Sequence, residues 1–159
     1  MFPLLQRLLR MDKREEVVFN WAYEEIAGIG RIFRPYIPVQ LNTREAGWKS
    51  FDFIVDTGAD FTMLPFYMAD ILGIKLKKSD EDKSTGIGGF EVKTWKIQIP
   101  VMIGKWQFVI PASITSENLT PLLLGRAGTL DTNFSWIFDL RKEDYFPEVN
   151  QARRFLIAQ

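Results

Sequence analysis

The stretch of the sequence best suited to chemistry covers residues 53–60 and reads Phe-Ile-Val-Asp-Thr-Gly-Ala-Asp. Apolar residues alternate with others over residues 51–55, which predicts a strand, and Gly58 then predicts a turn. Asp56 therefore lies where a strand ends. A charged carboxylate beside so much apolar sequence is costly unless a partner, a donor or a proton compensates it. We infer that Asp56 has a chemical role.

The chemistry that Asp56 could support is the activation of water. One carboxylate can accept a proton from water, but the attacked peptide carbonyl also needs a proton, so two carboxyls in opposite protonation states are required. Two carboxyls about 3 Å apart share one proton, because both cannot ionise. The chain has one Asp-Thr-Gly, and the triplet Asp131-Thr132-Asn133 lacks the glycine. The second carboxyl is then expected from a second copy related by a two-fold axis, which predicts a homodimer.

Composition narrows the alternatives. A chain of 159 residues fits one domain with a sizeable core. Its 20 basic and 20 acidic residues balance, so we expect no recruitment of nucleic acid by a global field. The absence of cysteine excludes disulfides and thiol catalysis, and the absence of histidine excludes serine-histidine catalysis and the usual zinc signatures. We expect no cofactor and no metal.

Three segments resemble the retropepsins, the single-domain aspartyl proteases of retroviral type, and they occur in that family's order. The segment similar to the active-site loop is Asp56-Thr57-Gly58-Ala59-Asp60. The segment similar to the glycine-rich flap is Gly86-Ile87-Gly88-Gly89-Phe90. The segment similar to the one that packs beside the active-site loop is Leu122-Leu123-Leu124-Gly125-Arg126. The resemblance covers the chain from about residue 32 to about residue 139.

The resemblance implies a role for each residue of the active-site loop. Asp56 would bind the catalytic water, Thr57 would hydrogen-bond across the dimer, and Thr57 and Gly58 together would hold the pair of acids. Ala59 and Asp60 would contact substrate. Arg126, which follows the apolar run 122–124, would pair with Asp60 and brace the site, because an arginine beside a core strand is costly unless paired.

The glycines at 86, 88 and 89 predict the tip of a hairpin. A phosphate-binding loop would require a helix directly afterwards, whereas residues 90–97 alternate as a strand. A flap needs backbone that can move and donate N–H groups to an extended peptide, and glycine permits both. Gly86, Ile87, Gly88 and Gly89 are therefore candidate substrate-binding residues, with Ile87 as an apolar lid over the cleaved bond.

The predicted fold is mainly β, a closed retropepsin-like barrel with one short helix. That helix follows Pro65 and ends at Gly73. We interpret residues 32–41, which carry two prolines, as an edge strand, because each proline lacks the N–H that a central ladder needs. The charged residues 75–84 predict a solvated loop. Further strands are expected at residues 48–55, 61–64, 97–103, 106–114, 122–124 and 134–139.

The two ends of the chain lie outside the resemblance. We expect an N-terminal extension over residues 1–29, a protease domain over 30–140 and a C-terminal extension over 141–159. Residues 1–10 suggest a short amphipathic helix that packs on the domain or its dimer mate, or attaches to a membrane surface. The segment is too short to insert stably, and it lacks a signal peptide's apolar run. Residues 17–29 could be strand or helix. The extension could bind a partner or be a removable pro-segment.

These observations predict a cytoplasmic, homodimeric aspartic endopeptidase that hydrolyses polypeptide substrates. Its dyad would consist of Asp56 from each of two subunits. The alternative is a non-catalytic peptide-binding or dimerisation module on the same barrel. The intact Asp-Thr-Gly argues against that alternative, because a protein without catalysis has no need of a costly paired aspartate.

Overall fold

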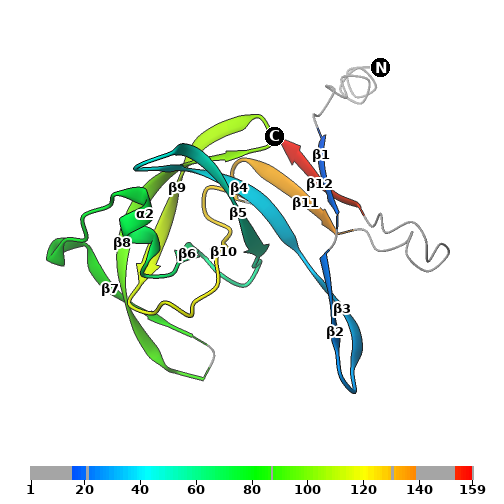
Figure 1. Ribbon diagram of the computed structural model, residues 1–159, viewed down its shortest axis with the longest axis horizontal. Coiled ribbons are helices and arrows are strands. Elements are labelled where there is room, and N and C mark those ends of the chain that lie inside the picture. The colour runs from blue at the N-terminus through cyan, green and yellow to red at the C-terminus, as the bar shows by residue number, and fades with distance from the viewer. Residues whose placement is uncertain (1–15, 21, 87, 130, 139–152, 159) are drawn as a thin grey trace, which may run out of the picture.

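The computed structural model describes residues 16–20, 22–86, 88–129, 131–138 and 153–158. The helix expected over residues 1–10 and the proposed lid residue Ile87 lie outside these ranges. Within them the chain is almost entirely β-structure (Figure 1). One short α-helix is present, α2 (Met68–Leu72), and it ends as expected at Gly73, whose φ of 68° is left-handed.

The strands follow one another along the whole described chain. Their bounds are β1 (Glu16–Asn20), β2 (Ala22–Ile26), β3 (Gly30–Arg34), β4 (Tyr36–Thr43), β5 (Gly47–Val55), β6 (Thr62–Leu64), β7 (Glu81–Thr85), β8 (Glu91–Ile103), β9 (Trp106–Thr115), β10 (Leu123–Leu124), β11 (Phe134–Phe138) and β12 (Arg153–Ala158). A 3₁₀ turn over Lys78–Asp80 precedes β7. The strands expected over residues 48–55, 61–64, 97–103, 106–114 and 134–139 are present as β5, β6, β8, β9 and β11.

A closed barrel forms the body of the molecule, as the sequence predicted. Its strand order is β4-β5-β10-β6-β9-β8, and β8 pairs again with β4 to close the ring. Strand β7 adds to β8 outside the ring. The parallel pairs β10–β5 and β6–β9 place the ends of β5 and β10 side by side. Closure removes the exposed strand edges that an open sheet would present.

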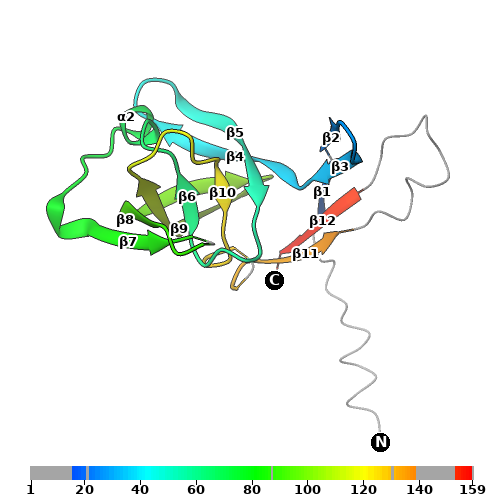
Figure 2. The ribbon, with the colours of Figure 1, turned by 90° about the horizontal axis from the view of Figure 1, so that it is seen from below.

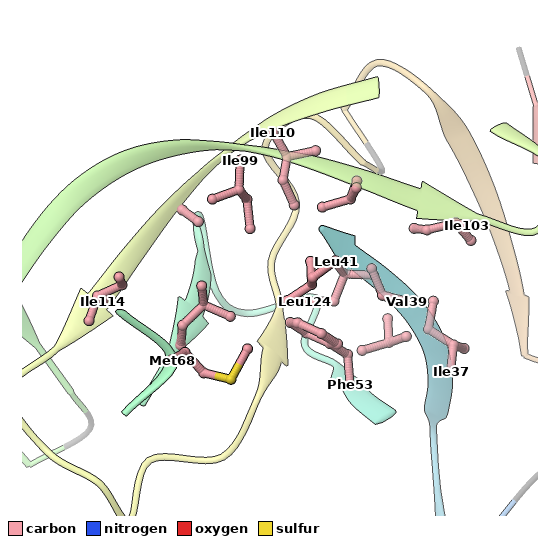
Figure 3. Packing of buried hydrophobic residues seen from close by; sticks show 14 of the residues in the cluster. Ile37, Val39, Leu41, Phe53, Met68, Ile99, Ile103, Ile110, Ile114 and Leu124 are labelled. Atoms are coloured by element: carbon pink, nitrogen blue, oxygen red, sulfur yellow. The ribbon is translucent and has the colours of Figure 1, made fainter. Parts of the chain in front are cut away.

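Alternate side chains from these strands fill the barrel interior (Figure 3). Ile37, Val39 and Leu41 show the period of two expected of a strand with one buried face, and all three are fully buried. They meet Phe53 of β5 and, from the helix α2, Met68. The other fully or almost fully buried members are Leu64, Ile99, Val101, Ile103, Ile110, Ala112, Ile114, Leu124 and Phe134.

The single edge strand predicted over residues 32–41 was wrong in two respects. The segment forms two strands, β3 and β4, separated at Pro35, and β4 pairs on both sides. Both pairings are possible because the second one, with β8, uses only Gln40 and Leu41, which lie beyond both prolines. Pro38 faces Asp52 of β5 and does not touch the second ladder.

The solvated loop predicted over residues 75–84 was also partly wrong. Its second half is strand β7, which pairs antiparallel with β8 from Glu81 opposite Trp95 to Thr85 opposite Glu91. Most lysines and carboxylates in this segment are exposed, as expected, but Glu81, Asp82 and Lys83 lie on a hairpin and form ion pairs across it. A charged strand at the edge of a sheet protects that edge from pairing with another chain.

Two smaller sheets lie beside the barrel (Figure 2). Strand β12 lies between β1 and β11, so segments near both ends of the chain share one sheet. Strands β2 and β3 form a separate hairpin, and the boundary expected between residues 29 and 30 falls in its turn. Residues 17–26, which the sequence left open, are extended at β1 and β2. In the described part of the chain no helix is long and apolar enough to cross a membrane.

Candidate active site

Asp56 lies directly after strand β5, at the end of a buried apolar segment. Its backbone N–H donates to the carbonyl of Leu124 at 3.0 Å, so the loop begins fixed to strand β10. The Gly58 N–H donates to the Asp56 side-chain oxygen Oδ1 at 2.9 Å, and the Ala59 N–H donates to the Asp56 carbonyl at 3.3 Å. These bonds orient the carboxylate within a tight turn. Asp56 is half-buried, while Thr57 is exposed.

Residues 122–127, which we call the clasp, form backbone hydrogen bonds with the end of β5 and with the far side of this loop. Ile54 N–H donates to Leu122 O at 2.9 Å, Arg126 N–H to Ala59 O at 3.0 Å, and Ala127 N–H to Asp60 O at 2.8 Å. Gly125 lies in this segment between Leu122 and Arg126. A Cβ built on Gly125 would stand 2.3 Å from the backbone carbon of Phe61. The glycine of the Leu-Leu-Leu-Gly-Arg segment therefore serves close backbone packing, and its φ is not left-handed.

Two buried threonines support the clasp and were not found from the sequence. Thr62 is fully buried, and its hydroxyl oxygen accepts the Gly125 N–H at 3.2 Å. Thr129 is fully buried as well, and its hydroxyl bonds to the carbonyls of Gly125 and, at 3.0 Å, of Arg126. Buried hydroxyls are costly unless they are hydrogen-bonded, and here the bonds secure the glycine that contacts the Asp56 loop. No residue pattern near Thr129 signals this role.

Arg126 pairs with Asp60 in the structure, as the resemblance implied. The guanidinium Nη2 contacts the Asp60 carboxylate Oδ1, but the two side chains are 44% and 71% exposed. The expectation that a buried arginine forces this pairing was therefore wrong, because water reaches both groups. The pair joins the loop that carries Asp56 to the segment after β10, in parallel with the backbone bonds.

The glycines expected at a flap tip lie at the turn between β7 and β8. The Gly86 N–H donates to Phe90 O and the Gly89 N–H to Gly86 O, both at 3.1 Å. Gly88 and Gly89 have φ values of 98° and 79°, which favour glycine. Phe90 is 79% exposed. Figure 1 shows this hairpin extending beyond the barrel on the side where β5 ends.

Thr57, Gly58 and Asp60 of the Asp56 loop are exposed. A pocket of about 300 Å³ lies elsewhere, between the β4–β5 turn and α2, and is lined by Thr43, Arg44, Glu45, Ala46, Lys49, Phe51, Asp70 and Ile71. It contains no residue of the 56–60 loop. Among the described residues no group of three acidic, histidine or cysteine side chains could hold a metal ion.

The sequence of the barrel matches the model of the aspartyl protease family over residues 37–127. That match spans more than half of the chain and includes Asp56, the clasp at Gly125 and the turn between β7 and β8. The chain belongs to the aspartyl protease family. The protease is accordingly a hydrolase, with the Asp-Thr-Gly loop at the end of β5 inside the matched region.

A solved structure shows the same fold. The protease is similar to a retropepsin-like aspartic protease from Rickettsia conorii, with a TM-score of 0.57 and 23% identity over 89% of this chain and 98% of that one. It also resembles EIAV protease, solved in complex with the inhibitor HBY-793, with a TM-score of 0.47 and 22% identity over 58% of this chain and 82% of that one. No curated protein matches it at a significant level.

Proposed function

We propose that the protease is a homodimeric aspartic endopeptidase whose dyad consists of Asp56 from two subunits. The observation that supports this most strongly is that Asp56 stands in the one Asp-Thr-Gly of a chain that belongs to the aspartyl protease family, whereas the proposed reaction needs two carboxyls. The chain supplies one Asp-Thr-Gly, and the other acid of that loop, Asp60, is ion-paired with Arg126. A second copy on a two-fold axis would bring the identical carboxyl.

In the proposed reaction the two Asp56 carboxyls share one proton. The ionised carboxyl removes a proton from water, and the resulting nucleophile attacks the peptide carbonyl carbon while the protonated carboxyl hydrogen-bonds the carbonyl oxygen. The proton taken from water then passes to the amide nitrogen as the C–N bond breaks, which releases an amine and a carboxylic acid. The Gly58 N–H, 2.9 Å from Asp56 Oδ1, would hold the carboxylate oriented for this task. Thr57 is exposed at the same turn, where its hydroxyl could bond across the two-fold axis.

The β7–β8 hairpin would close over the substrate as a flap. An extended polypeptide can add to exposed backbone groups like an extra strand, and the glycines at residues 86, 88 and 89 leave the backbone accessible. Two of these glycines have left-handed φ values that let the tip fold back without strain. Ala59 and Asp60, at the edge of the Asp56 loop, are the proposed contacts on the opposite side. A cytoplasmic location stays a prediction.

Cleavage of an unfolded polypeptide tests this function. The protease is incubated with reduced, alkylated substrate with and without a statine-type transition-state mimic, and products are identified by mass spectrometry. We expect cleavage that the mimic inhibits and that Asp56→Asn abolishes while fold and assembly are retained, because the amide cannot accept the proton from water. The cleavage sites would also define specificity.

Two results would contradict the proposal. Undiminished turnover in Asp56→Asn would exclude the carboxyl dyad. Binding of the mimic to a dimer without any cleavage of substrate would favour the non-catalytic peptide-binding module instead. The matched control is Asp52→Asn, which changes an exposed acid on β5 four residues earlier and should retain turnover.

A further inference from the structure

The β2–β3 hairpin leaves the barrel and packs on none of its core (Figures 1 and 2). Its five residue pairs join the two strands to each other, from Ala22 opposite Arg34 to Ile26 opposite Gly30, and neither strand pairs with another strand of the described chain. No residue of the hairpin belongs to the described hydrophobic core or packs against it. An isolated two-stranded hairpin is marginally stable in water.

The base of the hairpin lies beside the proposed catalytic residue. Strand β4 runs antiparallel to β5, with Tyr36 opposite Ile54, and the Val55 N–H donates to Pro35 O at 2.9 Å. Asp56 directly follows Val55, the last residue of β5. Arg34, the last residue of β3, directly precedes Pro35. The base of the hairpin is therefore next to the start of the Asp56 loop, and Figure 1 shows the hairpin extending away from the barrel.

A partner subunit must occupy the same side of the molecule. If two Asp56 carboxyls share a proton, the second copy lies directly beyond the end of β5. The hairpin leaves the barrel at Pro35, whose carbonyl accepts the N–H of the residue before Asp56, so the base of the hairpin borders that region. A second copy placed in this way would lie next to the base of the hairpin.

The surface of the hairpin suits a copy of the same chain. Its charges neutralise one another, since Arg31 pairs with Glu25 at 3.0 Å and Arg34 with Glu24 at 3.1 Å. A surface with no net charge does not repel its own copy. Ile29 at the tip is 73% exposed, although turn positions usually carry polar residues or glycine.

We propose that the β2–β3 hairpin is a dimerisation arm that contacts the second copy of the chain, with Ile29 buried in that contact. This inference rests on the proposed function, because it places the partner from the meeting of the two Asp56 side chains. It assigns a role to residues 22–34, all of which precede the region that matches the family model.

Site-specific cross-linking tests the arm without disturbing the fold. The natural chain has no cysteine, so Ile29→Cys creates a single attachment point for a photoreactive maleimide. Val109→Cys is the matched control, because Val109 is an aliphatic residue 58% exposed on the barrel strand β9. Sedimentation of each labelled protein, with the statine-type mimic present, establishes the dimer before illumination.

We expect covalent dimers from the label at residue 29 and none from the label at residue 109. A sedimenting dimer that yields no more cross-linked product at 29 than at 109 would overturn the arm while leaving the dyad intact. A chain that stays monomeric at every concentration would contradict the dyad and the arm together. The activity of Asp56→Asn, measured in parallel, reports on the dyad alone, so that failure of the arm is distinguished from failure of the dyad.

A charge at the tip provides a second measurement. Ile29→Lys should raise the dimer dissociation constant about tenfold or more, because burying an unpaired ammonium in an interface is costly. Val109→Lys adds the same charge to the barrel wall and should leave that constant within about twofold. Equal dissociation constants for the two variants would exclude Ile29 from the contact.

Discussion

Gly125 is the residue whose substitution should disturb the site most directly. A Cβ there would overlap the backbone of Phe61, five residues after Asp56, and backbone cannot move aside as a flexible side chain can. We expect Gly125→Ala to destabilise the fold by at least about 1–3 kcal/mol, the usual cost of overpacking. Urea unfolding followed by tryptophan fluorescence measures the loss.

Gly86→Ala is the control for that measurement. No atom lies within 4 Å of a Cβ built on Gly86, and its φ is not left-handed. Its free energy of unfolding should change by less than about 0.5 kcal/mol. Equal destabilisation by the two substitutions would show that Gly125 is not held against the Asp56 loop.

The buried Thr129 should stabilise the clasp more than the exposed ion pair does. Thr129→Val keeps the shape but removes the hydroxyl donor from the carbonyls of Gly125 and Arg126, a loss of about 1–3 kcal/mol. Asp60→Asn breaks a pair whose side chains are 71% and 44% exposed, which should cost less than about 1 kcal/mol. Chemical denaturation of both variants gives the comparison, and the opposite ranking would contradict the argument from burial.

At the scale of single residues, the sequence showed the motif and missed its supports. Asp56, Gly58 and Arg126 stand in segments whose spacing is recognisable, so they could be found. Thr62 and Thr129 could not, because a threonine becomes important only when distant strands enclose it. The pairing of Arg126 was expected from burial, yet both partners are exposed, so the expected contact rested on the wrong physical reason.

The β7–β8 hairpin carries its own system of ion pairs. Lys83 and Lys93 face each other directly across the strands, and each is compensated by a diagonal carboxylate, Glu91 at 2.6 Å and Glu81 at 2.9 Å respectively. A third pair joins Lys96 to Asp82 at 2.6 Å. Like charges opposite each other destabilise a hairpin, so these pairs offset a repulsion as well as adding attraction.

The pH window of these pairs follows from their pKa shifts. The hydrogen bond from Lys96 lowers the pKa of Asp82 below its ordinary 3.8, so the contribution of this pair is present above 3.8 and is lost as the pH falls through the lowered value. The hydrogen bond to Glu91 raises the pKa of Lys83 above 10.5, so that contribution is lost only as the pH rises through the raised value.

Amide hydrogen exchange of the hairpin tests this account. After correction for intrinsic rates, protection of β7 should stay constant between about pH 6 and 9 and should fall with added salt, because salt screens exposed charges. Strands β4 and β5 of the barrel provide the internal control. Salt-independent protection of β7 would show that the ion pairs do not hold the hairpin.

At the scale of elements, local patterns predicted the positions of strands better than they predicted which strands pair with each other. Alternation identified β5, β8, β9 and β11, and proline and glycine located the short helix. The edge position assigned to residues 32–41 failed because pairing with β8 uses only the two residues past the prolines. The strand β7 was missed because its sequence is charged, and only its partner β8 makes it extended.

For the whole molecule, the closed barrel followed from the resemblance and is confirmed. The sheet that joins β1, β12 and β11 could not be predicted, because β1 and β12 lie more than a hundred residues apart in the sequence. The dimer that we propose rests on the chemistry of the site, since one carboxyl cannot both take and give the proton.

Because the two carboxyls would titrate as a unit, the rate of cleavage should depend on pH in a bell shape with its maximum on the acid side of neutrality. The ion pairs of the β7–β8 hairpin persist through that range, so they should not shape the profile. The logarithm of kcat/KM against pH for a peptide substrate gives the profile. A flat profile from acid to neutral pH would contradict the shared proton.

Subunit mixing tests the central claim most directly. Wild-type protease at fixed concentration is equilibrated with increasing Asp56→Asn, and cleavage of one peptide is followed. If each site needs both Asp56 side chains, random pairing predicts that activity falls to about one half with one equivalent of the variant and continues to fall with more. Activity that stays constant as the inactive variant is added would show that each chain works alone.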